Sequence, residues 1–185
     1  MLHMEQKDYS MEVVAELLRG PCHVRGLAQR LSTNHMMVYR VVKRLLRENA
    51  VDYRKSGRNT AYFLKNTTEA RVYALMCESY KLLMMVSRYP AIRPVVDGLR
   101  ADRRIKMAVI FGSYAKSLAR PDSDIDLFVD AKDARLKQEL GRLDSRLNVK
   151  VGSYDKNNLL IREMEKNHVI IKGIEEFYER SGLLG

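Results

Sequence analysis

The sequence predicts an α+β protein built from two structured parts, and three observations support this. Helical apolar spacing followed by a two-strand pattern fills the first third of the 185 residues. A buried-strand pattern, interleaved with helical segments, fills the second half. Hydrophobic residues make up 46% and charged residues 30%, which is ordinary for a globular protein and excludes wholesale disorder and fibrous repeats. We expect the parts at 1–66 and 90–185, with a connector over 67–89.

The first part reads as three helices and a hairpin. Val13, Val14, Leu17 and Leu18 share one helical face, and Gly20-Pro21 ends that segment. Turn and cap residues, 32–34, precede the third helix. The expected elements are helices over 10–18, 23–31 and 35–49 and strands over 51–55 and 60–64, the strands joined by a basic turn at 56–59.

Positive charge is concentrated in this first part. The chain carries a net charge of +10, and residues 1–65 hold 12 basic and 6 acidic side chains. No acidic residue lies between Glu16 and Glu48. Such a field suits a polyanion, because each neutralised phosphate releases counterions. The alternative is a solvated basic surface without a partner.

The motifs L-A-x-x-L-S at 27–32 and V-Y-R-V-V-K-R-L at 38–45, followed by the hairpin, resemble the winged helix-turn-helix family. The resemblance covers roughly residues 9–66 and implies that the third helix enters the major groove of double-stranded DNA while the wing follows the backbone. Winged helices also serve as protein-interaction and dimerisation modules. The residues that the resemblance assigns to DNA contact are Asn34, His35, Met37, Tyr39, Arg40 and Lys43 on the helix and Lys55 and Arg58 on the wing.

The connector predicts one long helix over about 67–88, with a threonine cap ahead of it and Pro90 behind. Its apolar residues include Val72, Met76 and Leu83. A helix of this length can pair with its own copy, so we expect a homodimer through the connector helix.

In the second half, a helix over 93–100 precedes a buried strand over 105–111 that ends at Gly112-Ser113. A helix over 114–118 is expected next. Glycine at a strand-to-helix turn lets the backbone approach a ligand, and a serine at a helix N-terminus can contact a phosphate oxygen. By itself the pair is also ordinary turn chemistry.

The next strand, expected over 124–129, carries Asp124 and Asp126 on the same face. Two neighbouring carboxylates repel each other unless a cation lies between them, and hard oxygen ligands suit magnesium held jointly with phosphates. The alternative is a charged strand end in solvent.

The string F-G-S-Y-A-K-S-L-A-R-P-D-S-D-I-D-L-F-V resembles the motif of the DNA polymerase beta nucleotidyltransferase superfamily, particularly its minimal branch: Gly-Ser, ten residues, Asp-x-Asp. The resemblance covers about residues 90–185 and implies a nucleotidyltransferase fold with a small mixed β-sheet flanked by helices. It implies that Gly112, Ser113 and Lys116 bind the nucleoside triphosphate, and that Asp124 and Asp126 are catalytic and bind Mg2+. The nucleotide is expected to be ATP.

The chain departs from that family where a third carboxylate usually follows. After a helix expected over 133–147, the polar face of the next strand offers Asn148, Lys150 and Gly152, none of them acidic. Asp144 and Asp155 lie near the strand ends. Ser117 stands where the family often has glycine. The tail, 159–184, reads as amphipathic helix with a short break.

Three alternative functions follow. The first is a DNA-binding nucleotidyltransferase that transfers AMP to a protein or other acceptor, such as a HEPN-type toxin in a toxin-antitoxin pair. The second is a transcriptional regulator with a catalytically degenerate, nucleotide-sensing or partner-binding domain. A protein scaffold with an incidental basic helix is a third. The absence of a long apolar run, a signal peptide or a pairing of Cys22 with Cys77 predicts a cytoplasmic protein without membrane spans or disulfides.

Overall fold

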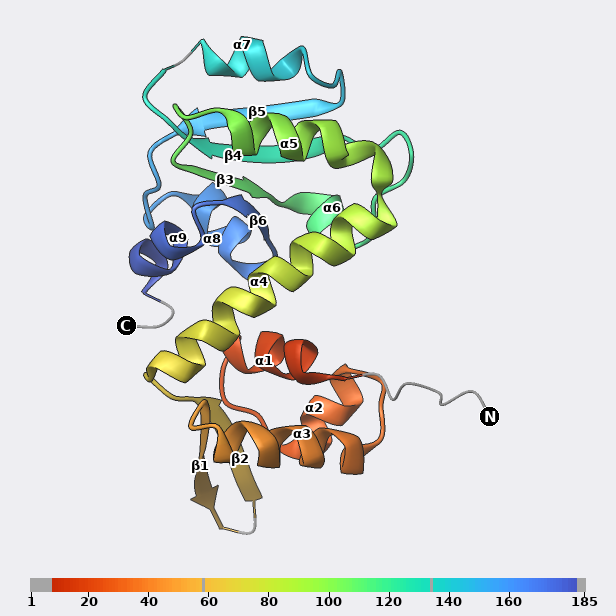
Figure 1. The fold of residues 1–185 in the computed structure, drawn as a ribbon, viewed down its shortest axis with the longest axis vertical. Helices are drawn as coiled ribbons and strands as arrows, with labels where there is room; N and C mark the ends of the chain where they lie inside the picture. The colour runs from red at the N-terminus through yellow and green to blue at the C-terminus, as the bar shows by residue number, and fades with distance from the viewer. Residues whose placement is uncertain (1–7, 58, 134, 183–185) are drawn as a thin grey trace. The chain divides into compact units, whose positions relative to one another are not determined.

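A computed structural model describes residues 8–57, 59–133 and 135–182 of the chain (Figure 1). The chain divides into two compact units, one up to Cys77 and one from Glu78 onward. The division falls inside the helix α4 (Thr68–Arg88), which is the helix expected for the connector. In the described chain, 8–57, 59–133 and 135–182, no helix is long and apolar enough to cross a membrane.

The first unit is a winged helix-turn-helix, as the sequence predicts. The hairpin strands pair antiparallel, from Val51 opposite Leu64 to Ser56 opposite Asn59. The elements are α1 (Ser10–Leu18), α2 (Val24–Arg30), α3 (His35–Arg47), β1 (Val51–Ser56) and β2 (Asn59–Leu64).

Side-chain caps and one apolar core explain why these helices form where they do. His23 accepts a hydrogen bond from the Gly26 amide at the start of α2, and Asn34 accepts one from the Met36 amide at the start of α3. Both satisfy amides that have no partner within the helix. Each helix buries one face, and Val13, Leu27 and Val42 are fully buried in the shared core. Cys22 and Cys77 are both buried, as small apolar residues would be.

The second unit is a mixed sheet with helices on both faces, so the predicted α+β class is confirmed. Its strands lie in the order β5-β4-β3-β6; β4 and β5 are parallel and the other pairs are antiparallel. The elements are the short helix η1 (Pro90–Ile92), α5 (Arg93–Ala101), β3 (Met107–Ile110), α6 (Gly112–Ala115), β4 (Ile125–Asp130), α7 (Leu136–Gly141), β5 (Leu147–Gly152), α8 (Leu159–Lys166), β6 (Val169–Lys172) and α9 (Ile174–Ser181).

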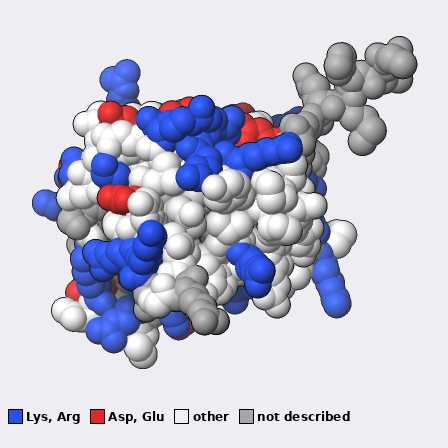
Figure 2. Space-filling model, turned by 90° about the horizontal axis from the view of Figure 1, so that it is seen from below, with Lys and Arg blue, Asp and Glu red and all other residues white. Residues whose placement is uncertain are grey.

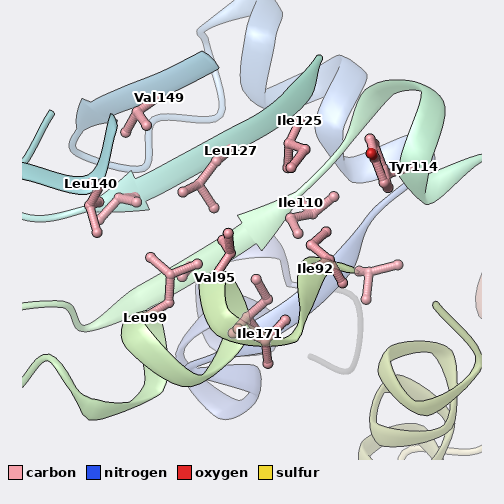
Figure 3. Close-up of a cluster of buried hydrophobic side chains, with 14 of the residues drawn as sticks. Ile92, Val95, Leu99, Ile110, Tyr114, Ile125, Leu127, Leu140, Val149 and Ile171 are labelled. Atoms are coloured by element: carbon pink, nitrogen blue, oxygen red, sulfur yellow. The ribbon is translucent and has the colours of Figure 1, made fainter. Parts of the chain in front are cut away.

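Alternation along β4 separates two cores. Ile125 and Leu127 point to the face covered by α5, where Figure 3 shows them with Ile110, Val95 and Leu99. Phe128 points to the opposite face and packs with the residues of α8 and α9. Because side chains alternate along a strand, Asp126 lies on the same face as Phe128. The helices α8 and α9 therefore flank the face that carries this carboxylate.

Two expectations about the C-terminal half are wrong. The helix expected over 133–147 is only α7, because the Asp144 carboxylate accepts the Arg146 amide and turns the chain into β5. The tail contains a strand, β6, instead of a break between helices. Its Val-Ile-Ile run pairs with β3, and Gly173 follows with φ +77°, where a Cβ would lie 2.5 Å from the Lys106 carbonyl oxygen.

The second unit buries a carboxylate. Glu78 of α4 is fully buried, and its Oε1 accepts hydrogen bonds from Lys81 Nζ (2.7 Å) and the Tyr178 hydroxyl (2.8 Å). His168 Nε2 lies 3.4 Å from the same oxygen. Burial by itself raises the pKa of this carboxyl, but the neighbouring His168 and Lys81 outweigh it and lower the pKa to about 2.

The pKa of Glu78 makes a prediction about acid stability. Because the folded pKa lies below the ordinary value of 4.5, the stabilisation is complete above about pH 4.5 and is lost as the pH falls toward 2. Replacing Glu78 by Gln should lower the free energy of unfolding at pH 7 by about 3 kcal/mol. The difference from the wild type should shrink between pH 4.5 and 2 in urea unfolding measured at a series of pH values.

A matched control is Glu163→Gln. Glu163 also pairs with a lysine three residues later, but its side chain is 69% exposed. Exposed ion pairs contribute little to stability, so the Glu163 variant should lose far less stability than the Glu78 variant. Equal losses for the two variants would contradict the role given to Glu78.

Candidate functional site

The turn between β3 and α6 places Gly112 directly against Asp126. Gly112 has φ +69°, a left-handed conformation that glycine adopts without strain. A Cβ on Gly112 would lie 2.2 Å from Asp126 Oδ2. The Phe111 amide donates to the Asp126 carbonyl oxygen at 3.0 Å and holds the two strands together at this point. The structure thus brings together two residues that the sequence predicts for one site.

Ser113 lies in α6, which is a single turn and begins at Gly112 rather than at residue 114 as expected. After this turn, the Leu118 amide donates a hydrogen bond to the Ser113 carbonyl oxygen (2.9 Å). Ser117 takes a left-handed conformation there, φ 58°, which explains why glycine suits this position. A helix this short offers a ligand its first amides, on Gly112 and Ser113, rather than the dipole of a long helix.

Asp124 precedes β4 and is exposed, whereas Asp126 lies within β4 and is half-buried. The loop before Asp124 is held by Arg146, which the sequence did not single out. Arg146 Nη1 donates to the Pro121 carbonyl oxygen (3.1 Å), and the Arg146 carbonyl oxygen accepts the Ile125 amide (2.8 Å). Arg146 therefore fixes the chain on both sides of Asp124.

Asn148 lies beside Asp126, on the strand where the family resemblance implies a third carboxylate. The two residues lie directly opposite each other on the parallel strands β4 and β5, and Asn148 Nδ2 donates to Asp126 Oδ1 at 3.0 Å. Asn148 and Lys150 are exposed on the polar face of β5, as expected.

The two other carboxylates near β5 have different partners. Asp144 forms an ion pair with Arg146 at 2.6 Å, and the hydrogen bonds from Arg146 lower the pKa of Asp144. Asp155 accepts the Asn157 amide at 2.9 Å in the loop after β5. Neither takes the place beside Asp126 that Asn148 fills.

Lys116 lies at the end of α6 and is exposed. The charge of Lys116 acts on Glu163 of α8. The hydrogen bond from Lys166 and, to a smaller extent, this charge lower the pKa of Glu163. Lys116 is thus available to an anion beside the Gly112 turn.

The residues predicted for DNA contact lie on α3, and most of them are exposed. Asn34 has its side-chain oxygen engaged as the helix cap, and Met37 is half-buried. Lys43 Nζ lies 5.5 Å from the centre of the Tyr39 ring, a cation-π contact that holds both side chains on the outer face. Those that are exposed are Asn34, His35, Tyr39, Arg40 and Lys43.

The wing adds basic residues next to this helix. Lys55 is exposed near the end of β1, whereas Arg58 lies outside the described residues. Arg54, which the sequence did not single out, stacks over the Phe63 ring at 4.7 Å. In Figure 2, Lys and Arg side chains are more widespread than Asp and Glu on the face seen from below. Arg44, by contrast, is turned back to Asp8 in an ion pair of 2.8 Å.

Comparison with protein families decides the nature of the second unit. Residues 95–176 match the family described as polymerase beta, nucleotidyltransferase. This stretch is a polymerase beta-type nucleotidyltransferase domain. The matched region contains β3, α6, β4 and β5, and so all the residues just described around Asp126. No curated protein matches the chain.

A solved structure is similar to another stretch of the chain. It is the homodimeric winged helix-turn-helix DNA-binding domain of a possible ArsR-family transcriptional regulator from Mycobacterium bovis, 20% identical, with a TM-score of 0.35. The match covers 38% of this chain and 65% of that one. The winged-helix assignment of the first unit rests on its own elements.

The nucleotidyltransferase domain fits a divalent ion held jointly with a substrate. Within the described ranges, 8–57, 59–133 and 135–182, no three His, Cys, Asp or Glu side chains gather closely enough to form a complete protein cage. Mg2+ is usually bound by one or two carboxylates together with substrate phosphates and water. Asp124 and Asp126 meet that pattern, and the missing side chain of Gly112 leaves the carboxylate of Asp126 its space.

The contact between Gly112 and Asp126 predicts that the site does not tolerate a side chain at the turn. Replacing Gly112 by Ala should lower the free energy of unfolding by about 1–2 kcal/mol through the left-handed backbone alone, and displace Asp126. Urea unfolding and Mn2+ binding measure the two effects. Gly152→Ala is the control in the same sheet, because a Cβ there meets nothing within 4 Å. Unchanged stability and Mn2+ affinity in the Gly112 variant would contradict this geometry.

Proposed function

We propose that this protein is a DNA-binding nucleotidyltransferase, which uses a nucleoside triphosphate with Mg2+ and transfers a nucleotidyl group, AMP, to an acceptor. The observation that carries the proposal is the packing of Gly112 against Asp126, with Ser113 and Asp124 beside them. A turn without a side chain next to a pair of carboxylates is what a metal-bound triphosphate requires.

The residues have distinct roles in this proposal. The amides of Gly112 and Ser113 donate to the terminal phosphates, and Lys116 balances their charge. Asp124 and Asp126 hold Mg2+, which stabilises charge on the attacking and leaving oxygens when bound. The acceptor hydroxyl oxygen attacks the α-phosphorus, the bond between that phosphorus and the pyrophosphate oxygen breaks, and the hydroxyl proton passes to water. Asn148 cannot take the acceptor proton, because an amide is not a base.

We propose that the acceptor is a protein and that the reaction takes place in the cytoplasm. The resemblance implies one instance of such an acceptor, a HEPN-type toxin in a toxin-antitoxin pair. The first unit would then bring the enzyme to double-stranded DNA. Exposed apolar residues on α4 support a homodimer through this helix: Val72, Met76, Leu83 and Met84.

A second candidate function is a transcriptional regulator whose nucleotidyltransferase domain senses a nucleotide or binds a partner without transfer. Asn148 favours it, because the residue beside Asp126 is an amide instead of a third carboxylate. The two candidates differ in whether labelled nucleotide becomes attached to an acceptor.

Transfer is tested with α-labelled ATP, CTP, GTP and UTP, Mg2+ and lysate of the source organism. We expect label from ATP on a protein band with the wild type and none with the double variant Asp124→Asn/Asp126→Asn. Asp122→Asn is the control, since Asp122 is exposed in the same loop but outside the Asp-x-Asp pair. Binding of nucleotide without transfer would favour the sensing regulator over the enzyme.

DNA binding through α3 makes a separate prediction. The double variant Arg40→Ala/Lys43→Ala should bind duplex DNA more weakly and reduce the slope of log affinity against log salt by about 2, because each phosphate contact contributes roughly 0.9. Fluorescence anisotropy at several salt concentrations measures the slope. The control, Lys137→Ala/Arg142→Ala, removes the same charge from exposed positions at α7. Equal slopes for both double variants would contradict DNA binding through α3.

A further inference from the structure

The neutral residue beside Asp126 changes the charge of the nucleotidyltransferase site. Asn148 lies opposite Asp126 and donates to its Oδ1 at 3.0 Å. A carboxylate in this place would repel Asp126 and favour a further cation between them. The amide instead satisfies one carboxylate oxygen with a neutral hydrogen bond. The site therefore has two carboxylates, Asp124 and Asp126, with which to hold metal ions.

A positive side chain follows on the same strand face. Lys150 is two residues beyond Asn148, and Val149 between them is buried in the core on the opposite face. Alternate residues of a strand lie about 6.5 Å apart, a distance that the flexible four-carbon stem of lysine spans. Lys150 is exposed and forms no ion pair with any residue in the described part of the chain.

Along the face of β4 that lies opposite Lys150, the residues differ in polarity, and Asp126 lies at its polar end. Phe128, opposite Lys150 on β4, is 3% exposed and packs with Ile161 and Met164 of α8. Farther along this face, Asp130 is already paired with Arg180 at 2.5 Å. On this face of the paired strands β4 and β5, the polar side chains on either side of Lys150 are therefore Asn148 and Asp126 in one direction and the already paired Asp130 in the other.

We propose that Lys150 binds the phosphates of the nucleotide, so that this domain holds one divalent ion per nucleotide and an ammonium group supplies the remaining positive charge. The inference rests on the proposed nucleotide binding. An ammonium contact to a phosphate is a charge-assisted hydrogen bond, which is stronger than a hydrogen bond between neutral groups. It persists without metal, whereas carboxylates bind phosphate only through a metal.

The experiment uses Mn2+ and a non-hydrolysable ATP analogue with the full-length protein. Electron paramagnetic resonance counts bound Mn2+ per nucleotide, and calorimetry gives the affinity for the analogue with Mn2+ and with EDTA. We expect one Mn2+ per nucleotide, and a loss of affinity of about tenfold or more in Lys150→Met under both conditions. Lys137→Met, an exposed lysine of α7, should bind the analogue as the wild type does.

Asn148→Asp adds the missing carboxylate and should raise the count to two Mn2+ per nucleotide. Urea unfolding of Lys150→Met is the control for folding. We expect the stability of the wild type, because the replaced lysine is exposed. Two Mn2+ ions in the wild type, or equal affinities of the Lys150 and Lys137 variants, would overturn this inference and leave the proposed function standing. No binding of the analogue by the wild type would overturn both.

Discussion

The contact between Gly112 and the carboxylate of Asp126 is the constraint on which the candidate site depends. It needs a backbone at φ +69° and no side chain, and it joins the end of β3 to β4, where the Phe111 amide holds the Asp126 carbonyl oxygen. The other parts of the site are arranged around this contact. Ser113 follows Gly112 in the short turn of α6, Asp124 enters from the loop that Arg146 fixes, and Asn148 donates to the second oxygen of the same carboxylate. A sheet with apolar cores on both faces provides the rigid support that such a close approach requires.

The two units differ in how their charged side chains are distributed. The winged helix buries apolar faces of three helices and leaves the basic face of α3 exposed, so its charge is available to a polyanion. The nucleotidyltransferase domain has nearly balanced charge and instead gathers a few polar groups at one end of β3 and β4. It also contains the buried Glu78, whose carboxylate is paired with Lys81 of α4, accepts a hydrogen bond from Tyr178 of α9 and lies beside His168, just before β6. The helix α4 is distant in the sequence from β6 and α9, and the buried charge makes their correct packing a condition of stability.

Local signals predicted most of the fold, and long-range contacts account for the differences. Gly20-Pro21, the Asn34 cap and alternation along β4 are visible within a few residues, and the elements they predict are present. The strand β6 was missed because four apolar residues carry too little periodicity to separate strand from helix, and only pairing with β3 decides it. The length of α7 was overestimated since its apolar spacing continues to Leu147, while the Asp144 turn stops it. The contact of Arg146 with the Pro121 loop and the Glu78–His168 pair have no sequence signal, because each joins residues that are far apart in the chain. Asn148 beside Asp126 was expected from the polar face of its strand.

In the proposed function, the Gly112 turn and the two carboxylates together bind a metal-bound triphosphate. A crystal structure of the protein with Mg2+ and a non-hydrolysable nucleotide tests it most directly. We expect phosphate oxygens at the amides of Gly112 and Ser113 and a metal ion on Asp124 and Asp126. A nucleotide bound elsewhere on the domain, or a metal ion that contacts neither carboxylate, would contradict it.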